Sequence, residues 1–303
     1  MFSCVYLINV HSLQNPNEAS QQKCTFRVMS FNVLAQGLSS DSFVRCPPEA
    51  LQFDRRLGEI VAELTRYSAD VICLQEVDMF EQMKKKLSDY KGLWVPKPTS
   101  PCLMSDDNIG PDGSAIFYKP STVQLLAHHS EVIEVDGKAT GQVLLAAHLK
   151  LSTDIKLLVV CVHLKAKSPH SKLREKQGRA ILKYIENNSG ECDTVIVAGD
   201  LNSDPSEPVH TLLESSGFIC SYSSAVGCRS EYTTCKIRMV DGVETLQKKT
   251  EDYIYYRNLK KKNQFSVARV LQIPNETSLG EGRLPNMDYP SDHLSMVTDF
   301  AIP

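Results

Sequence analysis

The stretch TVIVAGDLNSDPSEP, residues 194–208, joins a run of small and β-branched apolar residues to an acid and an amide two positions apart. The apolar run predicts a buried strand. Because strand side chains alternate between faces, Asp200 and Asn202 point the same way if the extended geometry continues to Asn202. Two interpretations remain open for this stretch alone: a polar site at the end of the strand, and an ordinary turn rich in Asp, Asn, Ser and Pro.

Strand-like apolar runs alternate with helical patterns along the chain. The predicted strands cover residues 26–34, 70–77, 112–119, 143–151, 155–167, 194–202, 252–257, 265–273 and 294–300, and the predicted helices cover 48–67, 79–90 and 172–187. Strands that are apolar on both faces, mixed with helices, favour a two-sheet α/β sandwich flanked by helices. Residues 1–25 are expected to form a poorly ordered leader, 26–303 a single domain, and 236–251 a polar loop.

The composition is that of an ordinary soluble globular protein, with 303 residues of which 42% are hydrophobic and 23% are charged. A formal net charge of -3 gives no general attraction to nucleic acid. Ten cysteines occur without CxxC pairs or zinc-ligand spacing, so reduced, buried thiols are expected. No signal peptide or membrane span is predicted. We expect a cytoplasmic monomer, with nuclear or mitochondrial presence left open.

Several predicted strands change from apolar to polar on one face where they end. Three examples are Asn32 after Val28 and Ser30, Glu76 after Ile72 and Leu74, and His163, Lys165 and Lys167 after Val159 and Cys161. Asp200 and Asn202 are a fourth. Ligand sites in α/β sheets collect at strand ends, so the four changes together favour a site over four separate turns.

Near the C-terminus, Asp292 and His293 directly precede an apolar run, and Asp252 begins another. A carboxylate partner fixes the tautomer of a histidine, and either acid is a candidate for that role. A simple cap by Ser291 or Asp292 is the alternative. Oxygen ligands without thiolates suit Mg²⁺ or Mn²⁺, and the accompanying cations and imidazoles suit a phosphate ester.

The ordered motifs FNVL, LQEVD, GPDGSAIF, HLKAK, GDLNSDP, DYIYY and SDHLSMV resemble the endonuclease/exonuclease/phosphatase superfamily over about residues 27 to 300. This resemblance implies a metal-dependent phosphoesterase with a single catalytic domain at 26–303. It implies that Glu76, Asn32 and Asp292 hold the metal ion. It also implies that Asp200, Asn202, His163, His293 and Asp252 are catalytic, with Asp252 orienting His293.

The resemblance assigns substrate binding to Lys165, Lys167, Asp112, Lys236 and Arg238. Within the superfamily, the most similar members imply removal of the 2′-phosphate from NADP⁺ and NADPH to give NAD⁺ and NADH. Two positions depart from that pattern: Lys167 replaces an arginine, and Cys235 replaces a tryptophan in what is interpreted as a substrate-facing loop. Glu251 also stands at a position that is usually apolar.

Three functions remain open at this point. The first is an NADP(H) 2′-phosphatase, the second is a poly(A)-specific 3′-exoribonuclease that releases AMP, and the third is a binding module without catalytic activity. A nuclease needs a positive groove with stacking residues along several nucleotides, which the net charge and Cys235 do not favour. RNA is therefore the less favoured partner, and NADP(H) the more favoured one.

Overall fold

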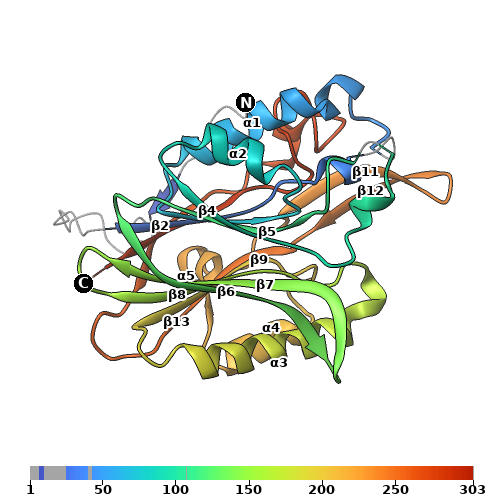
Figure 1. Ribbon diagram of the computed structural model, residues 1–303. Helices are drawn as coiled ribbons and strands as arrows, with labels where there is room; N and C mark the ends of the chain where they lie inside the picture. The colour runs from blue at the N-terminus through green and yellow to red at the C-terminus, as the bar shows by residue number, and fades with distance from the viewer. Residues whose placement is uncertain (1–6, 10–24, 40–42, 107, 303) are drawn as a thin grey trace.

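The computed structural model describes residues 7–9, 25–39, 43–106 and 108–302. Two mixed β-sheets pack face to face, and helices cover their outer faces (Figure 1). This arrangement confirms the predicted two-sheet α/β sandwich. None of the described helices is long and apolar enough to cross a membrane. The cysteines within the described residues are free thiols, and most of them are buried.

The first sheet has seven strands. In spatial order they are β1 (Leu7–Asn9), β14 (Ser266–Leu271), β15 (Met296–Ala301), β2 (Thr25–Asn32), β3 (Val71–Gln75), β5 (Gly113–Tyr118) and β4 (Lys91–Pro96). Strands β2 and β3 run parallel, and the other neighbours run antiparallel. The outer face of this sheet carries α1 (Phe53–Arg66) and α2 (Phe80–Lys86) (Figure 1).

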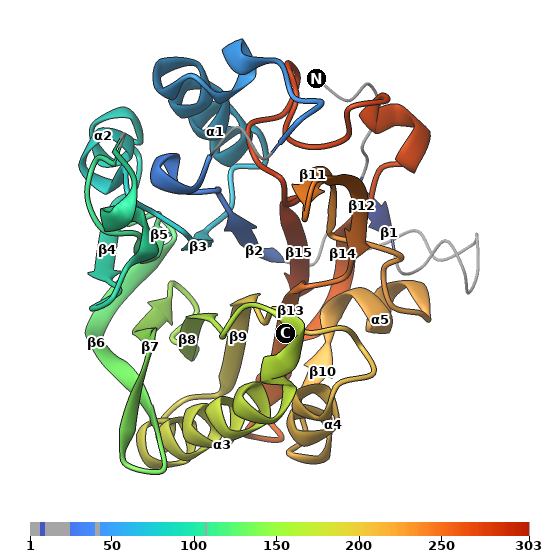
Figure 2. The same ribbon diagram turned by 90° about the vertical axis from the view of Figure 1, so that its right-hand side faces the viewer.

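The second sheet has six strands. In spatial order they are β10 (Ile219–Cys220), β13 (Asp252–Asn258), β9 (Thr194–Asp200), β8 (Lys156–His163), β7 (Lys138–Leu151) and β6 (Val123–Val135). Its outer face carries α3 (Ser171–Asn188) and α4 (Pro208–Ser215), while α5 (Ser221–Val226) lies beside β13 and β14 (Figures 1 and 2). Short 3₁₀ turns link several elements: η2 (Gln36–Leu38), η3 (Pro48–Leu51), η4 (Pro101–Met104), η5 (Ser168–His170) and η6 (Glu276–Leu279).

The central core lies between the two sheets and explains why alternate strand residues are apolar. Val28, Cys161, Ala198 and Ile254 belong to this buried cluster, each from a different strand. Phe300 is fully buried in the same cluster. Burying one such large side chain contributes about 1.5–3 kcal/mol, so the paired inner faces hold the sheets at a fixed separation. The polar residues that continue these inner faces at the strand ends therefore lie together at one edge of the sandwich.

Two stretches differ from the sequence-based expectation. Residues 236–251, expected to be a loop, lie mostly in the hairpin of β11 (Thr234–Val240) and β12 (Val243–Lys249), which projects from one end of the sandwich (Figure 1). Cross-strand pairing stabilises this polar segment despite its low hydrophobicity. Within the predicted leader, Leu7–Asn9 pairs with β14 as an edge strand, so the leader prediction is wrong for these three residues. The remainder of the predicted leader lies outside the described residues, apart from Thr25, which begins β2.

Five further elements were not anticipated. Strands β4, β6 and β10 and helices α4 and α5 lie in stretches that are too short or too irregular to give a clear period. The predicted helix at 48–67 is divided at Gln52 into η3 and α1. Most residues of β6 still pair with β7, with register shifts at Leu126 and Ile133, which indicates that the partner strand, rather than its own pattern, specifies it.

Gly199 offers a test of the strand packing next to the site. A Cβ atom at Gly199 would lie 1.9 Å from the backbone oxygen of Val162 on β8. We expect Gly199→Ala to lower the free energy of unfolding by about 3 kcal/mol or more, because backbone atoms must move apart. Gly58→Ala is the matched control: Gly58 is an exposed position in α1 with no atom within 4 Å of the added Cβ. It should stabilise the protein by about 0.5–1 kcal/mol. Equal unfolding midpoints in urea for the two variants would contradict this packing.

Candidate active site

Strand register brings three predicted site residues into one row. His163 at the end of β8 pairs with Asp200 at the end of parallel β9, and Asp252 at the start of antiparallel β13 pairs with Asp200 from the other side. All three positions continue inner-face alternation, as shown by Cys161, Ala198 and Ile254 in the central core. Their side chains therefore leave the apolar core at the same rim. Each of the three is at least nine-tenths buried.

Asn32, the last residue of β2, connects this row to the other sheet. Its Nδ2 donates to Glu76 Oε1 and to Asp200 Oδ2, each at 3.0 Å. Its Oδ1 accepts from the backbone N–H of Leu34 at 3.0 Å. The side chain thus uses its donors to orient two carboxylates and its oxygen to hold its own loop. The amide of Asn32 therefore positions the two carboxylates, and its predicted role as a metal ligand stays a prediction.

Glu76 and Asn202 reach the site through left-handed backbone conformations. Their φ angles are +56° and +48°. Glu76 comes directly after the last residue of β3, and Asn202 is the second residue after the end of β9. The strand alternation used to predict them therefore stops before either residue. The Asn202 N–H donates to Asp200 Oδ1 at 2.7 Å, and its Nδ2 donates to the Leu164 oxygen at 3.2 Å. Such backbone strain costs about 1–3 kcal/mol and often accompanies function.

Asp252 and His293 form a buried pair. His293 Nδ1 lies 2.8 Å from Asp252 Oδ2, which also accepts from Thr233 Oγ1 at 2.6 Å. Burial lowers the pKa of His293, but the charges of Asp252 and Asp292 and the bond to Asp252 outweigh it and raise that pKa to about 10. His293 is therefore an imidazolium at neutral pH. Its Nδ1 proton is held by Asp252, which leaves Nε2–H for the cavity that His293 lines.

His163 is held in the opposite charge state. Lys97 Nζ lies 3.2 Å from His163 Nδ1 and 2.6 Å from Asp112 Oδ2. Since an ammonium only donates, Nδ1 accepts and the single ring proton is on Nε2. Burial, followed by the charges of Lys97 and His293, keeps the pKa of His163 well below its usual value. His163 is thus a neutral donor, with Nε2 at 3.6 Å from Asp200 Oδ2.

The Lys97 contact also changes the role expected for Asp112. Asp112 was predicted to bind substrate, but it is fully buried, does not line the cavity, and accepts from Ser100 Oγ at 2.5 Å. It is the fixed partner of Lys97, which does line the cavity. Sequence analysis missed Lys97 because nothing in its neighbourhood distinguishes it from a surface lysine. Only the fold brings it to His163.

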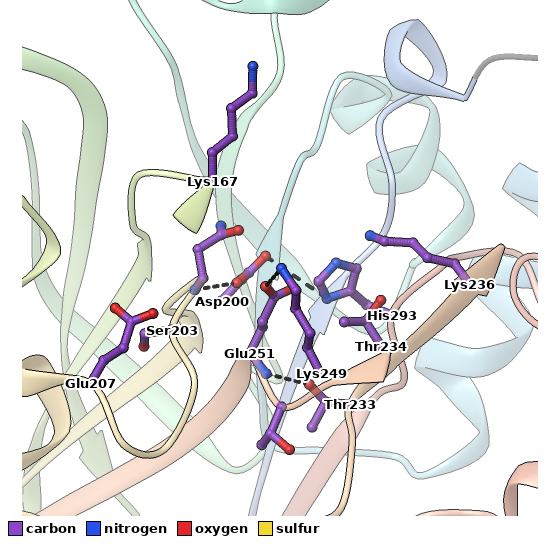
Figure 3. A network of polar contacts seen from close by, with 12 residues as sticks. Lys167, Asp200, Ser203, Glu207, Thr233, Thr234, Lys236, Lys249, Glu251 and His293 are labelled. Carbon is purple, nitrogen blue, oxygen red and sulfur yellow. Dashed lines mark hydrogen bonds and ion pairs between the residues drawn. The ribbon is translucent and has the colours of Figure 1, made fainter. Parts of the chain in front are cut away.

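The site opens into a cavity of about 640 Å³ between the two sheets and the hairpin. The charged and titratable groups that line it are Glu76, Lys97, His163, Lys165, Lys167, His170, Asp200, Lys236, Arg238, Glu251, Asp292 and His293. Figure 3 shows Lys167 and Lys236 on different sides of Asp200 and His293. Cys235, interpreted as part of a substrate-facing loop, is instead fully buried in the outer core and does not line the cavity.

Some of the cations at or beside this cavity are paired with acids. Lys236 Nζ lies 2.5 Å from Asp292 Oδ2, and Lys249 Nζ lies 3.3 Å from Glu251 Oε1. Asp292, predicted to hold metal, is thus the ion-pair partner of Lys236. Burial raises its pKa, but Lys236 and His293 together bring that pKa below its usual value. Among the described residues, Lys165 and Lys167 have no acidic side chain within ion-pair distance.

Arg56 was also missed, and it holds the loops that carry the site. It is fully buried in α1 and donates to the backbone oxygens of Val33 at 2.8 Å, Pro290 at 2.9 Å and Leu34. The loop after β2 and the segment before Asp292 are therefore tied to the same side chain. The sequence did contain a signal for this role, because Arg56 is a charged residue on the apolar face of an amphipathic helix.

Two groups of side chains are close enough to share a metal ion: Glu76, His163 and Asp200, and Asp200, Asp252 and His293. In the second group His293 is a cation held by Asp252, which does not suit a metal ligand. In the first group His163 carries its proton on Nε2, so the carboxylates of Glu76 and Asp200 are the available ligands. Carboxylate oxygens suit a hard divalent cation, and these residues therefore fit one.

The profile of the Endonuclease/Exonuclease/phosphatase family matches residues 29–293. The chain therefore belongs to this family. Within it, the chain is similar to nocturnins: it is 38% identical to nocturnin of Xenopus laevis over 93% of this chain and 74% of that protein. It is 33% identical to nocturnin of Drosophila melanogaster over 97% of this chain, although it spans about half (49%) of that protein.

A more distant relative is the CCR4-Not complex 3′-5′-exoribonuclease subunit Ccr4 of Emericella nidulans, 23% identical over 91% of this chain and 52% of that protein. Among solved structures, the human Nocturnin catalytic domain with bound sulfate anion superposes with a TM-score of 0.75 at 30% identity, covering 93% of this chain and 98% of that one. ANGEL2, a 2′,3′-cyclic phosphatase, has a TM-score of 0.74 at 21% identity, with 92% and 96% covered, which supports the fold.

The charge state of His293 gives a testable pH dependence. In Asp252→Asn the raising effect of Asp252 is lost while burial remains, so the pKa of His293 should fall toward or below its ordinary value of about 6.5. The imidazole should then be neutral at pH 7.5 and become charged only as the pH falls. Phosphoesterase activity at pH 7.5 should fall by about 10²-fold or more. NMR titration of labelled histidine in both proteins measures the shift, and an unchanged His293 titration would contradict the assigned pairing.

Proposed function

We propose that the chain is a magnesium-dependent phosphomonoesterase that removes the 2′-phosphate of NADP⁺ and NADPH. One observation supports this most strongly: two lysines on one short segment line the described cavity with no acidic side chain within ion-pair distance, beside two histidines of fixed protonation. Lys165 and Lys167 follow β8 directly after His163. Such a set accommodates one phosphoryl group, whereas a polynucleotide needs unpaired cations along an extended groove.

The remaining cations support the same substrate. Lys97, Lys236 and Lys249 each have an acid within 3.3 Å, so little of their positive charge is left for a second phosphate. The Arg238 guanidinium lies 4.3 Å from the centroid of the Phe43 ring. The similar human Nocturnin domain carries a bound sulfate anion, which resembles a single phosphoryl group in charge and shape. The resemblance of the motifs to that branch of the family supports NADP(H) as the dinucleotide.

The proposal assigns a role to each side chain. Glu76 holds the divalent cation, taken as Mg²⁺ with Mn²⁺ as the alternative, and a bound cation supplies charge neutralisation and a more acidic water. His163 and His293 donate their Nε2 protons to phosphoryl oxygens, which stabilises the charge that develops there. Lys165 and Lys167 neutralise the phosphate. Asp200, whose pKa burial and Asp252 raise, accepts the proton of the attacking water at Oδ2, and Asn202 holds Asp200 in place.

The first test is product analysis with NADP⁺ and oligo(A) offered in parallel with Mg²⁺ at physiological salt. NADP⁺ should give NAD⁺ and inorganic phosphate, and oligo(A) should be shortened slowly or not at all. Glu76→Gln and Asp200→Ala should each abolish the reaction while circular dichroism shows an unchanged fold. Efficient release of AMP from oligo(A), with NADP⁺ unchanged, would instead support the exoribonuclease function suggested by the more distant Ccr4 match.

The two lysines give a second test. Lys165→Ala should raise KM for NADP⁺ by about tenfold or more, because a charge-assisted hydrogen bond contributes about 1.5–3 kcal/mol. Lys167→Arg should be neutral or favourable, since a guanidinium can bind a phosphate through two donors. Lys84→Ala is the control, because Lys84 is an exposed lysine on α2 that faces no cavity. Steady-state kinetics that give Lys165→Ala the constants of this control would remove Lys165 from the site.

A further inference from the structure

Gln142, on β7, is a buried amide that lines the active-site cavity without a hydrogen-bonding partner. Its side chain is 8% exposed, and its Oε1 is shielded from solvent with no donor within reach. Of the described buried side chains that leave a nitrogen or oxygen unpaired, Gln142 is the one that lines this cavity. Leaving a buried polar group unpaired costs about 1–3 kcal/mol, so this amide requires an explanation.

The wall around Gln142 is polar but uncharged. Thr99, Thr140 and Gly141 line the cavity beside it. Asp200 ends β9, which lies between β8 and β13 in the second sheet. The strand that carries Gln142, β7, lies beyond β8, whereas Glu251 directly precedes β13 on the opposite side. The cavity therefore extends in two directions from Asp200: a neutral wall on one side, and ion-paired residues on the other. An uncharged part of a ligand is better accommodated on the neutral wall.

Hydrogen bonds connect this neutral wall to the proposed phosphate position. Gln177 on α3 donates from Nε2 to Thr140 Oγ1 at 3.0 Å, and its Oε1 accepts from the Lys165 N–H at 3.1 Å. One buried side chain thus bridges the Gln142 wall and Lys165. A nucleotide whose phosphate contacts Lys165 has its nucleoside within reach of the wall.

We propose that Gln142 recognises the adenine base of the substrate through its side-chain amide. A glutamine amide presents an acceptor beside a donor, which matches the amino group and ring nitrogen N7 on one edge of adenine. The 6-oxo purines place an acceptor where adenine has its amino donor, so one of the two bonds is lost. Because Oε1 is shielded in the free structure, the amide turns toward the base on binding, and this turn breaks no hydrogen bond of Oε1. Gln142 is then a specificity-determining residue. The inference rests on the proposed function only in taking a nucleotide as the substrate.

The direct test compares NADP⁺ with deamino-NADP⁺, in which hypoxanthine replaces adenine. The wild-type protein should prefer NADP⁺ in kcat/KM by about tenfold or more, the discrimination expected of one bidentate amide contact. Gln142→Leu should bring that ratio close to one by losing activity on NADP⁺. Gln142→Glu retains the acceptor and loses the donor, so it should keep part of the preference. Gln124→Leu, at an exposed position on neighbouring β6, is the control and should retain the wild-type ratio.

A binding measurement separates this inference from the proposed reaction. Calorimetry on the Asp200→Asn protein with Mg²⁺ compares adenosine 2′-phosphate with inosine 2′-phosphate, and adding Gln142→Leu should remove the preference for adenosine. If the wild-type protein does not hydrolyse NADP⁺, the proposed function is wrong. The preference for adenine is still tested, because the calorimetry measures binding and not hydrolysis. Equal affinities for the two nucleotides, or a preference that persists in Gln142→Leu, would overturn the role of Gln142.

Discussion

The rest of the site depends on the pairing of Asp200 with Asp252 across two antiparallel strands. Their backbones are directly opposite in register, and both side chains are almost fully buried. Two carboxylates in such positions repel each other and are costly to remove from water. His293 compensates: its Nδ1 lies 2.8 Å from Asp252 Oδ2 and 4.0 Å from Asp200 Oδ2. The raised pKa of His293 is the direct consequence of this arrangement.

Hydrogen bonds from neighbouring residues hold the two carboxylates and the second histidine in place. Asn32 and the Asn202 N–H donate to Asp200, and Thr233 donates to Asp252. On the far side of the row, Lys97 fixes His163 as a neutral donor. The site thus holds one charged and one neutral histidine, each with a ring nitrogen within 4.0 Å of Asp200 Oδ2. Each charge state follows from which groups the two sheets bring together, so small changes in strand register would alter the chemistry.

Much of this was predictable from sequence, although not always for the right reason. The alternation argument holds for Asn32, His163 and Asp200, because each is the last residue of a regular strand. Glu76 and Asn202, which alternation also proposed, do line the cavity, yet they enter it through left-handed backbone conformations that alternation does not predict. The motif resemblance pointed to the same two residues independently.

What the sequence could not give depends on contacts between distant segments. Lys97 and Gln142 look like ordinary strand or loop residues, and only the packing of both sheets places them on the cavity. The ion pairs of Asp112 with Lys97 and of Asp292 with Lys236 were not predicted, because the lysine partners lie elsewhere in the chain. The β11–β12 hairpin was missed because its own residues are polar. Tertiary pairing of charges was therefore the least predictable feature.

Pairing of charge also limits what the cavity can bind. Lys97 and Lys236 each face an acid, whereas Lys165 and Lys167 line the described cavity with no acidic side chain within ion-pair distance. The account therefore requires cleavage of a terminal phosphate by attack of water at phosphorus. Hydrolysis of NADP⁺ in ¹⁸O-labelled water, followed by mass spectrometry of both products, tests this directly. The account predicts one ¹⁸O atom in inorganic phosphate and none in NAD⁺. Label in the dinucleotide, or labelled AMP from oligo(A) without labelled phosphate from NADP⁺, would contradict it.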